Sequence, residues 1–147
     1  MKILKIRDVK TPVRGTPKSA GIDFFIPNDF QPTIIPPFGS INIPSGIKVK
    51  LPHGFCLKLD NKSGVSLKKR LSVGATIIDE DYQGEIHLHV YNTSKEPVEI
   101  DPGDKIVQGL LIPVSYELVM EVGSLEELYG GEVTSRGEGG FGSTGER

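Results

Sequence analysis

The sequence contains one cysteine and no long apolar run, and each scarcity excludes a class of protein. Cys56 alone cannot form an internal disulfide, so a disulfide-stapled secreted domain is excluded and we expect a reducing, cytoplasmic setting. No stretch approaches the roughly 18 apolar residues of a membrane helix, so we expect no membrane partner. The first ten residues break every apolar run with a charge, and we expect no signal peptide there.

An excess of basic residues is also lacking. The chain has 17 Lys and Arg against 19 Asp and Glu, and its formal net charge is -2. This balance does not favour non-specific binding of duplex nucleic acid, so we expect no nucleic-acid partner. A small anionic ligand is still compatible with the composition, because local positive groups decide its binding.

Glycine and proline, in contrast, are abundant. The 18 Gly and 11 Pro make up 29 of 147 residues, about 20% of the chain, where average usage is nearer ~12%. Glycine and proline at this frequency interrupt long helices and favour many short strands joined by turns. The length suits one domain, and the 37% hydrophobic content predicts a modest core that burial between subunits would help.

Alternating apolar residues predict strands along most of the chain. They cover residues 3–6, 22–26, 40–51 with a turn at 44–46, 55–59, 77–78, 85–91, 105–114 and 116–122. Short helices are expected after Ser63 and over 124–128, where Ser124 and Glu127 have the spacing of a capping box. The sequence predicts an all-β barrel or sandwich over residues 1–130 and a glycine-rich C-terminal arm over 131–147.

The arm carries the most unusual composition, from Arg136 to Gly145. Its glycines allow successive backbone N–H groups to surround one anion, and Ser143, Thr144 and the forked Arg136 add donors for phosphate oxygens. Phe141 is a lone aromatic that can stack on a flat base. Glycines 137, 139 and 142 match GxGxxG, but the chain leaves no room for the helix that this fingerprint needs. A disordered, solvated tail is the alternative.

Two further segments could carry chemistry, and each also has a plain structural explanation. Ser63 could cap a short helix whose free N–H groups face a phosphate, with Lys62 supplying charge; a turn with an exposed lysine is the alternative. Residues 78–84 are expected to form a hairpin tip crowded with three carboxylates, one of which could be a general base, although acidic turns are common. His87 and His89 share a strand face, but two ligands do not complete a zinc site.

Taken in order, five segments resemble the motifs of the trimeric dUTP pyrophosphatases (dUTPases). These are Ala20-Gly21-Ile22-Asp23, Lys62-Ser63-Gly64, the stretch from Gly74 to Gly84, the stretch from Gly103 to Gln108, and the arm from Arg136 to Gly145. The resemblance runs from residue 20 to 145. It implies a jelly-roll-like β-barrel that assembles as a homotrimer, with sites at subunit contacts and an arm that closes over a neighbouring copy's site.

The resemblance also implies hydrolysis of dUTP to dUMP and pyrophosphate. Asp79 would orient and activate the attacking water, and Asp23 would hold Mg²⁺ through water, as suits an ion that dehydrates reluctantly. The expected phosphate ligands are Lys62, Ser63, Gly64, Gln108, Arg136, Gly142, Ser143 and Thr144.

The base and sugar would be recognised by the third motif and the arm. Backbone groups of the stretch containing Gly74, Ile77 and Ile78 would read uracil, Tyr82 would pack under the sugar, and Phe141 would cap the base. Cytosine would leave buried groups unpaired, which can give large discrimination.

Four departures from the usual family pattern stand out: Ile22 for Tyr, Asn61-Lys62 for Pro-Arg, Gln83 for Arg, and Gly109 for an apolar residue. Lysine in place of arginine keeps the charge but loses bidentate phosphate geometry, so altered phosphate affinity is expected.

Two rival functions remain at this point. One is dCTP deaminase, a relative of the same fold, which would require a catalytic Glu where His89 stands. The other is a non-enzymatic nucleotide sensor that binds a regulatory protein. Ammonia release from dCTP would indicate the first, and tight dUTP binding without turnover would indicate the second.

Overall fold

The computed structural model describes residues 1–140. Contacts along the chain divide it into two compact units, Met1–Tyr116 and the remainder from Glu117. The first unit holds the sheets, and the second contains the short helix α2 (Leu125–Tyr129). The functional division expected at residue 130, between a hydrolase domain and a closing arm, stays a prediction.

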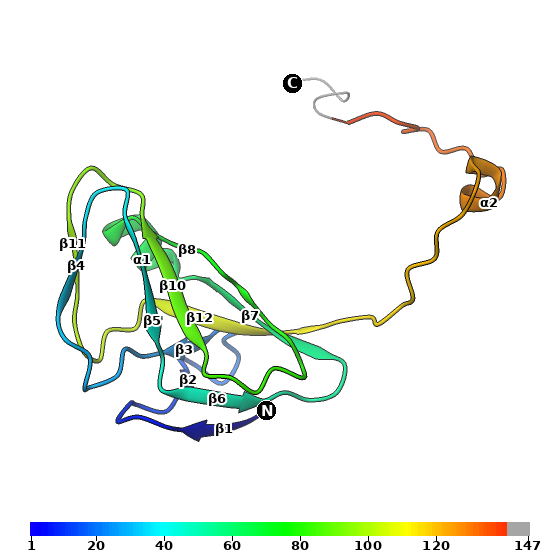
Figure 1. The fold of residues 1–147 in the computed structure, drawn as a ribbon. Coiled ribbons are helices and arrows are strands. Elements are labelled where there is room, and N and C mark those ends of the chain that lie inside the picture. The colour runs from blue at the N-terminus through cyan, green and yellow to red at the C-terminus, as the bar shows by residue number, and fades with distance from the viewer. Residues whose placement is uncertain (141–147) are drawn as a thin grey trace. The chain divides into compact units, whose positions relative to one another are not determined.

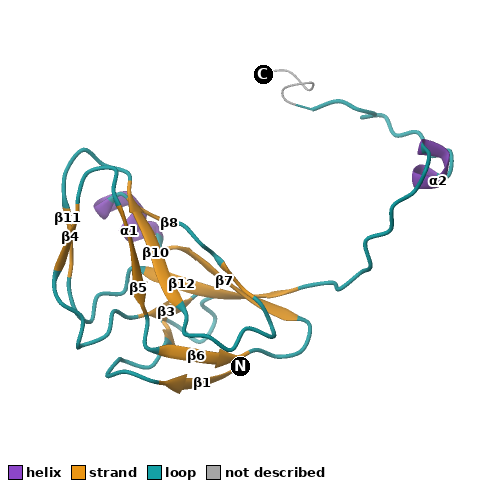
Figure 2. Cartoon of the chain, in the orientation of Figure 1, coloured by secondary structure: helices purple, strands orange, loops and turns teal. Residues whose placement is uncertain are grey.

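Within the described residues the first unit consists of short strands and one helix (Figures 1 and 2). The strands are β1 (Lys2–Lys5), β2 (Val13–Arg14), β3 (Ile22–Phe24), β4 (Thr33–Ile35), β5 (Ser40–Pro44), β6 (Ile47–Lys50), β7 (Phe55–Asn61), β8 (Leu71–Val73), β9 (Ile77–Ile78), β10 (His87–Asn92), β11 (Val98–Ile100) and β12 (Val107–Pro113), and the helix is α1 (Ser63–Lys69).

Among residues 1–140 every strand pair is antiparallel, and the strands form four small sheets. The largest has the order β2-β3-β12-β7-β9, and the others are β5-β10-β8, β1-β6 and β11-β4. Neighbours in a sheet are often far apart in sequence, as in the crossovers of a jelly roll. The predicted all-β, jelly-roll-like fold is confirmed.

The core lies between these sheets and follows the predicted alternation. Ile86, Leu88 and Val90 are buried, while His87 and Tyr91 at alternate positions are exposed. Phe24 in β3 and Leu57 in β7 are fully buried on the two strands that flank β12 in the large sheet, and Gly109 of β12 lies against both of them. Cys56 is buried in β7, as its position in an apolar strand predicts.

Three expectations about local structure were wrong. Residues 116–122 form no strand, because the described part of the chain supplies no partner for their backbone. The segment 78–84 is not a hairpin tip, since β9 pairs with β7 whereas β10 pairs with β5 and β8. Ser63 is not the N-cap of α1; Lys62 holds that position in an extended conformation, and its side chain makes no capping hydrogen bond.

The expected short helix near the C-terminus is confirmed. Ser124 is the N-cap of α2 and its Oγ accepts a hydrogen bond from the Glu127 N–H at 3.1 Å. The Glu127 carboxylate accepts in turn from the Gly123 N–H at 2.8 Å. Among residues 1–140 no helix is long and apolar enough to cross a membrane.

Candidate active site

A buried carboxylate lies at the centre of the first group of candidate site residues. Asp23 in β3 is only 6% exposed, and its two oxygens contact the ammonium groups of Lys62 and Lys105, the latter at 3.2 Å. Burial raises the pKa of Asp23, but the hydrogen bonds and charges of the two lysines together lower it by more, so the pKa lies below its ordinary value. Asp23 is therefore an anion at neutral pH, and two cations share it.

Gln108 in β12 is adjacent to Asp23 in the strand register. Its Nε2 donates a hydrogen bond to the Asn61 carbonyl at 2.7 Å, at the point where β7 ends and α1 is about to begin. The amide can take this position because Gly21 has no side chain; a Cβ there would lie 1.9 Å from Gln108 Oε1. The first, second and fourth motifs thus meet at one place.

A cavity of about 380 Å³ opens beside this group. Its lining includes Lys62, Ser63, Gly64, Lys68, Lys69, Asp104, Lys105 and Gln108. Lys69 is paired with Asp104 at 2.9 Å, which leaves an excess of positive charge on the wall. Such a cavity has the chemistry to hold an anionic group such as phosphate.

The start of α1 adds backbone donors to the same cavity. The first turn of any helix has N–H groups without intrahelical acceptors, and here no side chain from the N-cap position takes them up. A Cβ built on Gly64 meets nothing within 4 Å, so packing does not require glycine there. A side chain would instead extend into open space that a ligand could use.

The described residues include no cluster of three potential ligands that could hold a metal ion by itself. An ionised Asp23 at the cavity edge fits a hydrated Mg²⁺ whose other ligands come from bound phosphates. It does not fit a cation bound directly by protein alone, because both oxygens already contact ammonium groups.

Asp79 belongs to a second cavity, of about 240 Å³, that lies over Leu59, Ala75, Ile77, Ile78, Asp79, Tyr82, Glu85, Ile86 and His87. Asp79 directly follows β9, whose Ile78 pairs with Leu57. Its backbone carbonyl accepts from the Tyr82 N–H at 3.2 Å, which closes a turn. The Asp79 side chain makes no hydrogen bond or ion pair with any residue between 1 and 140.

Tyr82 is fixed by its hydroxyl group, which donates to the Glu85 carbonyl at 3.0 Å. Its ring lies over Gly84, where a Cβ would be 2.2 Å from the Tyr82 oxygen. The side chain is 43% exposed, so one face of the ring is available to a ligand.

The backbone at Gly74 is held by β10. The Gly74 N–H donates to the His89 carbonyl at 2.8 Å, and the Ala75 N–H donates to His89 Nδ1 at 3.2 Å. A Cβ on Gly74 would lie 2.3 Å from His89 Nδ1, so only glycine permits this approach. His89 also packs on Tyr91 with ring centres 4.7 Å apart, so it has a structural role that the sequence did not reveal.

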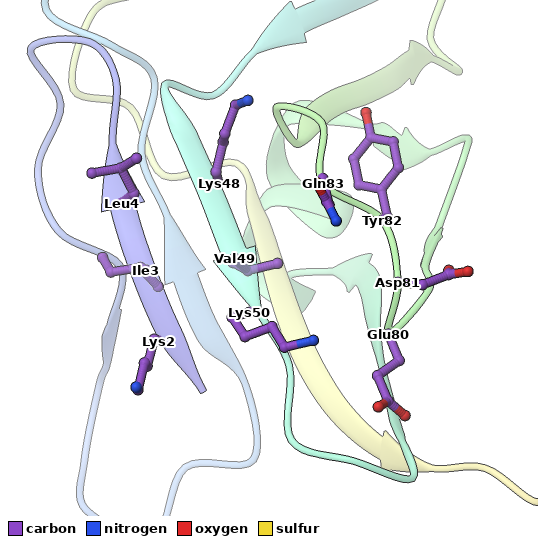
Figure 3. A pocket seen from close by; sticks show the side chains of 10 residues that line it. All are labelled: Lys2, Ile3, Leu4, Lys48, Val49, Lys50, Glu80, Asp81, Tyr82 and Gln83. Carbon is purple, nitrogen blue, oxygen red and sulfur yellow. The ribbon is translucent and has the colours of Figure 1, made fainter.

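Two of the departures from the family pattern have clear structural explanations. Ile22 is 7% exposed and contributes to the core. A Cβ on Gly109 would lie 2.9 Å from carbons of both Phe24 and Leu57, so these larger side chains occupy the space that an apolar residue would need. Gln83 lines a separate hollow of about 510 Å³ between its loop and strands β1 and β6 (Figure 3).

The described start of the arm is a tight turn in the second unit. Arg136 Nε donates to the Gly139 carbonyl at 2.9 Å, and Gly137 has a φ of 49°. Phe141, Gly142, Ser143 and Thr144 lie outside the described residues. Their expected contacts with base and phosphate stay predictions.

The structure thus brings the predicted residues of one chain into two groups. Lys62, Ser63, Gly64 and Gln108 line the first cavity, whereas Ile77, Ile78, Asp79 and Tyr82 line the second. No residue from 1 to 140 lines both cavities. The sequence did not reveal Lys105 as a partner of Asp23. Its place next to Asp104 in the fourth motif was the one signal that could have suggested it.

Comparison with known proteins places these features in a family context. Residues 7–145 match the model of the dUTPase family. A deoxyuridine 5′-triphosphate nucleotidohydrolase from Hydrogenobaculum sp. is 37% identical over 150 residues, which cover 99% of each chain. The human mitochondrial protein of the same name is 36% identical over 134 residues; these cover 91% of this chain but 50% of the human protein.

A solved structure shares the fold. The dUTPase of Staphylococcus bacteriophage 80alpha, as a mutant with dUpNHpp, has a TM-score of 0.83 over 98% of this chain and 97% of that one, at 23% sequence identity.

Proposed function

This chain belongs to the dUTPase family, and from that premise we propose that it hydrolyses dUTP to dUMP and pyrophosphate with Asp79 as the general base. The observation that carries the proposal is the full-length similarity to a dUTP nucleotidohydrolase. Two cavities of complementary chemistry support it. One is cationic with donors suited to phosphate, and the other is largely apolar and bears the Asp79 carboxylate, which makes no hydrogen bond or ion pair with residues 1–140.

Asp79 receives a proton from the attacking water. The water oxygen forms a bond to the α-phosphorus as the bond from that phosphorus to the α–β bridging oxygen breaks, and pyrophosphate leaves with the bonding electrons. A carboxylate is a weak base at neutral pH, so its position relative to the water must contribute more than its proton affinity. The absence of a competing hydrogen bond to the Asp79 side chain within residues 1–140 favours this role.

The cationic cavity binds the triphosphate. Lys62 and Lys105 neutralise phosphate charge, and the first turn of α1 and Gln108 donate hydrogen bonds to phosphate oxygens. The remaining phosphate ligands come from the arm: Arg136, Gly142, Ser143 and Thr144. When bound, Mg²⁺ neutralises phosphate charge and orients the oxygens. Asp23 is the residue that would hold its water shell.

The segment from Gly74 to Ile78 reads the base through its backbone, which His89 and β7 hold in place. Tyr82 packs under the sugar and excludes a ribose 2′-hydroxyl, and Phe141 covers the base. The separation of the two cavities on one chain favours a homotrimer in which neighbouring copies supply the two halves. A cytoplasmic location remains our expectation from the single cysteine.

A pyrophosphate-release assay with dUTP, dCTP, dTTP and UTP, each with and without Mg²⁺, tests the proposal. Release from dUTP alone, dependent on Mg²⁺, is the expected result. Asp79→Asn should retain nucleotide binding but lower kcat by about 10³-fold, a loss of general-base and positioning effects together. An unchanged kcat would remove Asp79 from the mechanism, and ammonia release from dCTP would indicate a deaminase instead.

A further inference from the structure

Glu80, the residue after Asp79, makes a cluster of hydrogen bonds and does not line the 380 Å³ or the 240 Å³ cavity, although it lines the hollow shown in Figure 3. Its Oε2 accepts from the Gly54 N–H at 2.8 Å and from the Tyr116 hydroxyl at 2.8 Å. Its Oε1 lies 3.1 Å from His53 Nδ1. The Glu80 side chain is 21% exposed, whereas the His53 side chain is 90% exposed.

These contacts connect three segments that are distant in sequence. Gly54 lies in the turn between β6 and β7, with a φ of 78°. Its carbonyl accepts from the Val114 N–H at 2.9 Å while its own N–H donates to Glu80. Tyr116 is the last residue of the first unit. Glu80 therefore fastens the loop of residues 79–84 to the β6–β7 turn and to the chain that leaves β12.

The electrostatics favour a persistent contact. The Gly54 N–H, the Tyr116 hydroxyl and His53 lower the pKa of Glu80 to about 2. The same carboxylate, with smaller effects from burial, Asp81 and Asp79, raises the pKa of Tyr116 to about 12. Across the neutral range the acceptor is ionised and the donor keeps its proton.

Asp79 needs such an anchor because its own side chain makes no hydrogen bond or ion pair with any residue between 1 and 140. On its N-terminal side the backbone is fixed by the pairing of Ile78 with Leu57. On its C-terminal side Glu80 makes the nearest fixed contact. Figure 3 shows the Glu80 side chain pointing away from Tyr82, so it holds the loop without entering the sugar side of the cavity.

We propose that Glu80 is a positioning residue for Asp79, and that its bonds to Gly54 and Tyr116 fix the catalytic loop to the end of the β-domain from which the C-terminal segment departs. This rests on the proposed role of Asp79. Displacement of a reacting group by ~1 Å costs about 10²-fold in rate, so a partial loss of the anchor should change kcat.

The test compares Glu80→Ala, Glu80→Gln and Tyr116→Phe with two matched controls, Glu99→Ala on β11 and Tyr129→Phe in α2. Tyr129 and Tyr116 are each 60% exposed, so loss of a hydroxyl is compared at equal exposure. We expect Glu80→Ala to lower kcat for dUTP about 10-fold, with KM changed less than about 2-fold. Glu80→Gln should retain a higher kcat than Glu80→Ala, and Tyr116→Phe should lower kcat about 3-fold. Both controls should match the wild type.

A pH series of Tm reports whether the ionised Glu80 contact stabilises the fold, and the kcat values then separate positioning from a purely structural role. The gap in Tm between wild type and Glu80→Gln should be constant above pH 4.5, the ordinary pKa of the group, and should close as the pH falls toward 2. The sign follows from a folded-state pKa below the ordinary value. His53, Tyr116, Asp79 and Asp81 are the titratable groups that face this contact.

A Tm gap with unchanged kcat in Glu80→Ala and Tyr116→Phe would overturn the proposal and leave Glu80 a structural residue only. Equal loss in the controls would also overturn it. If the wild-type protein itself leaves dUTP intact, the proposed function has failed instead, and the pH series of Tm still reports whether the contact exists.

Discussion

Two glycines, one just before β3 and one in the adjacent strand β12, should give opposite phenotypes when each is changed to alanine. Gly21 precedes β3 and Gly109 lies in β12, in register with Ile22. Each leaves space that another side chain occupies, but Gly21 makes room for the exposed amide of Gln108 and Gly109 makes room for two core side chains. The same added methyl group therefore probes the candidate site at one position and the core at the other.

Gly21→Ala should impair the reaction more than the fold. The new Cβ would lie 1.9 Å from Gln108 Oε1 and 2.7 Å from its Cδ, so the amide must rotate away and lose its bond to the Asn61 carbonyl. One neutral hydrogen bond contributes about 0.5–1.5 kcal/mol to stability, whereas one to a charged group such as phosphate contributes about 1.5–3 kcal/mol. The expected loss in kcat/KM is about 10- to 100-fold, since ~1.4 kcal/mol corresponds to tenfold.

Gly109→Ala should impair the fold more than the reaction. Its Cβ would lie 2.9 Å from carbons of Phe24 and Leu57, which are both fully buried. Overpacking of this kind costs about 1–3 kcal/mol, which for a chain of this length lowers Tm by roughly 3–10 °C. Once folded, the variant should keep kcat/KM within about 2-fold, because Gln108 is undisturbed.

Thermal unfolding and steady-state pyrophosphate release, measured on both variants at equal protein concentration, show whether each substitution impairs the fold or the reaction. Gly21→Ala with unchanged kcat/KM would show that the position of Gln108 does not matter to the reaction. Gly109→Ala with an unchanged Tm would show that Phe24 and Leu57 can repack around the added methyl group without loss of stability.

Two further outcomes are expected. Deletion of residues 136–147 should leave the oligomeric state unchanged in size-exclusion chromatography and abolish turnover, because Arg136 and the arm complete the phosphate shell; activity in the truncated protein would make the arm a tail. Tyr82→Ala should narrow the preference for dUTP over UTP, measured as the ratio of kcat/KM values, since the ring would no longer oppose a 2′-hydroxyl; an unaltered ratio would mean that the sugar is read elsewhere.

Local periodicity was enough to predict most of the sheet residues. The alternation of Ile86, Leu88 and Val90 was confirmed because one side of β10 faces the core. The strands β4 and β11 escaped prediction because each has three residues and follows a proline, so periodicity has too little length to be read.

The errors have a common physical origin in partners that the sequence does not specify. Residues 116–122 have the pattern of a strand, but a strand needs a neighbour. The hairpin expected at 78–84 requires β9 and β10 to pair with each other. Instead, β9 pairs with β7, and β10 pairs with β5 and β8. In the same way, His53, Glu80 and Tyr116 carry no common sequence signal, and only folding brings them together.

The absence of any shared wall between the cavity of Gln108 and that of Asp79 has a genetic consequence. If different copies supply the two halves of each site, an Asp79→Asn chain and a Gln108→Ala chain can complement each other. When equal amounts are unfolded and reassembled together, roughly a quarter of the sites would join two intact halves under random mixing. Activity above that of either parent would reveal a composite centre, whereas a simple average would mean that each polypeptide works alone.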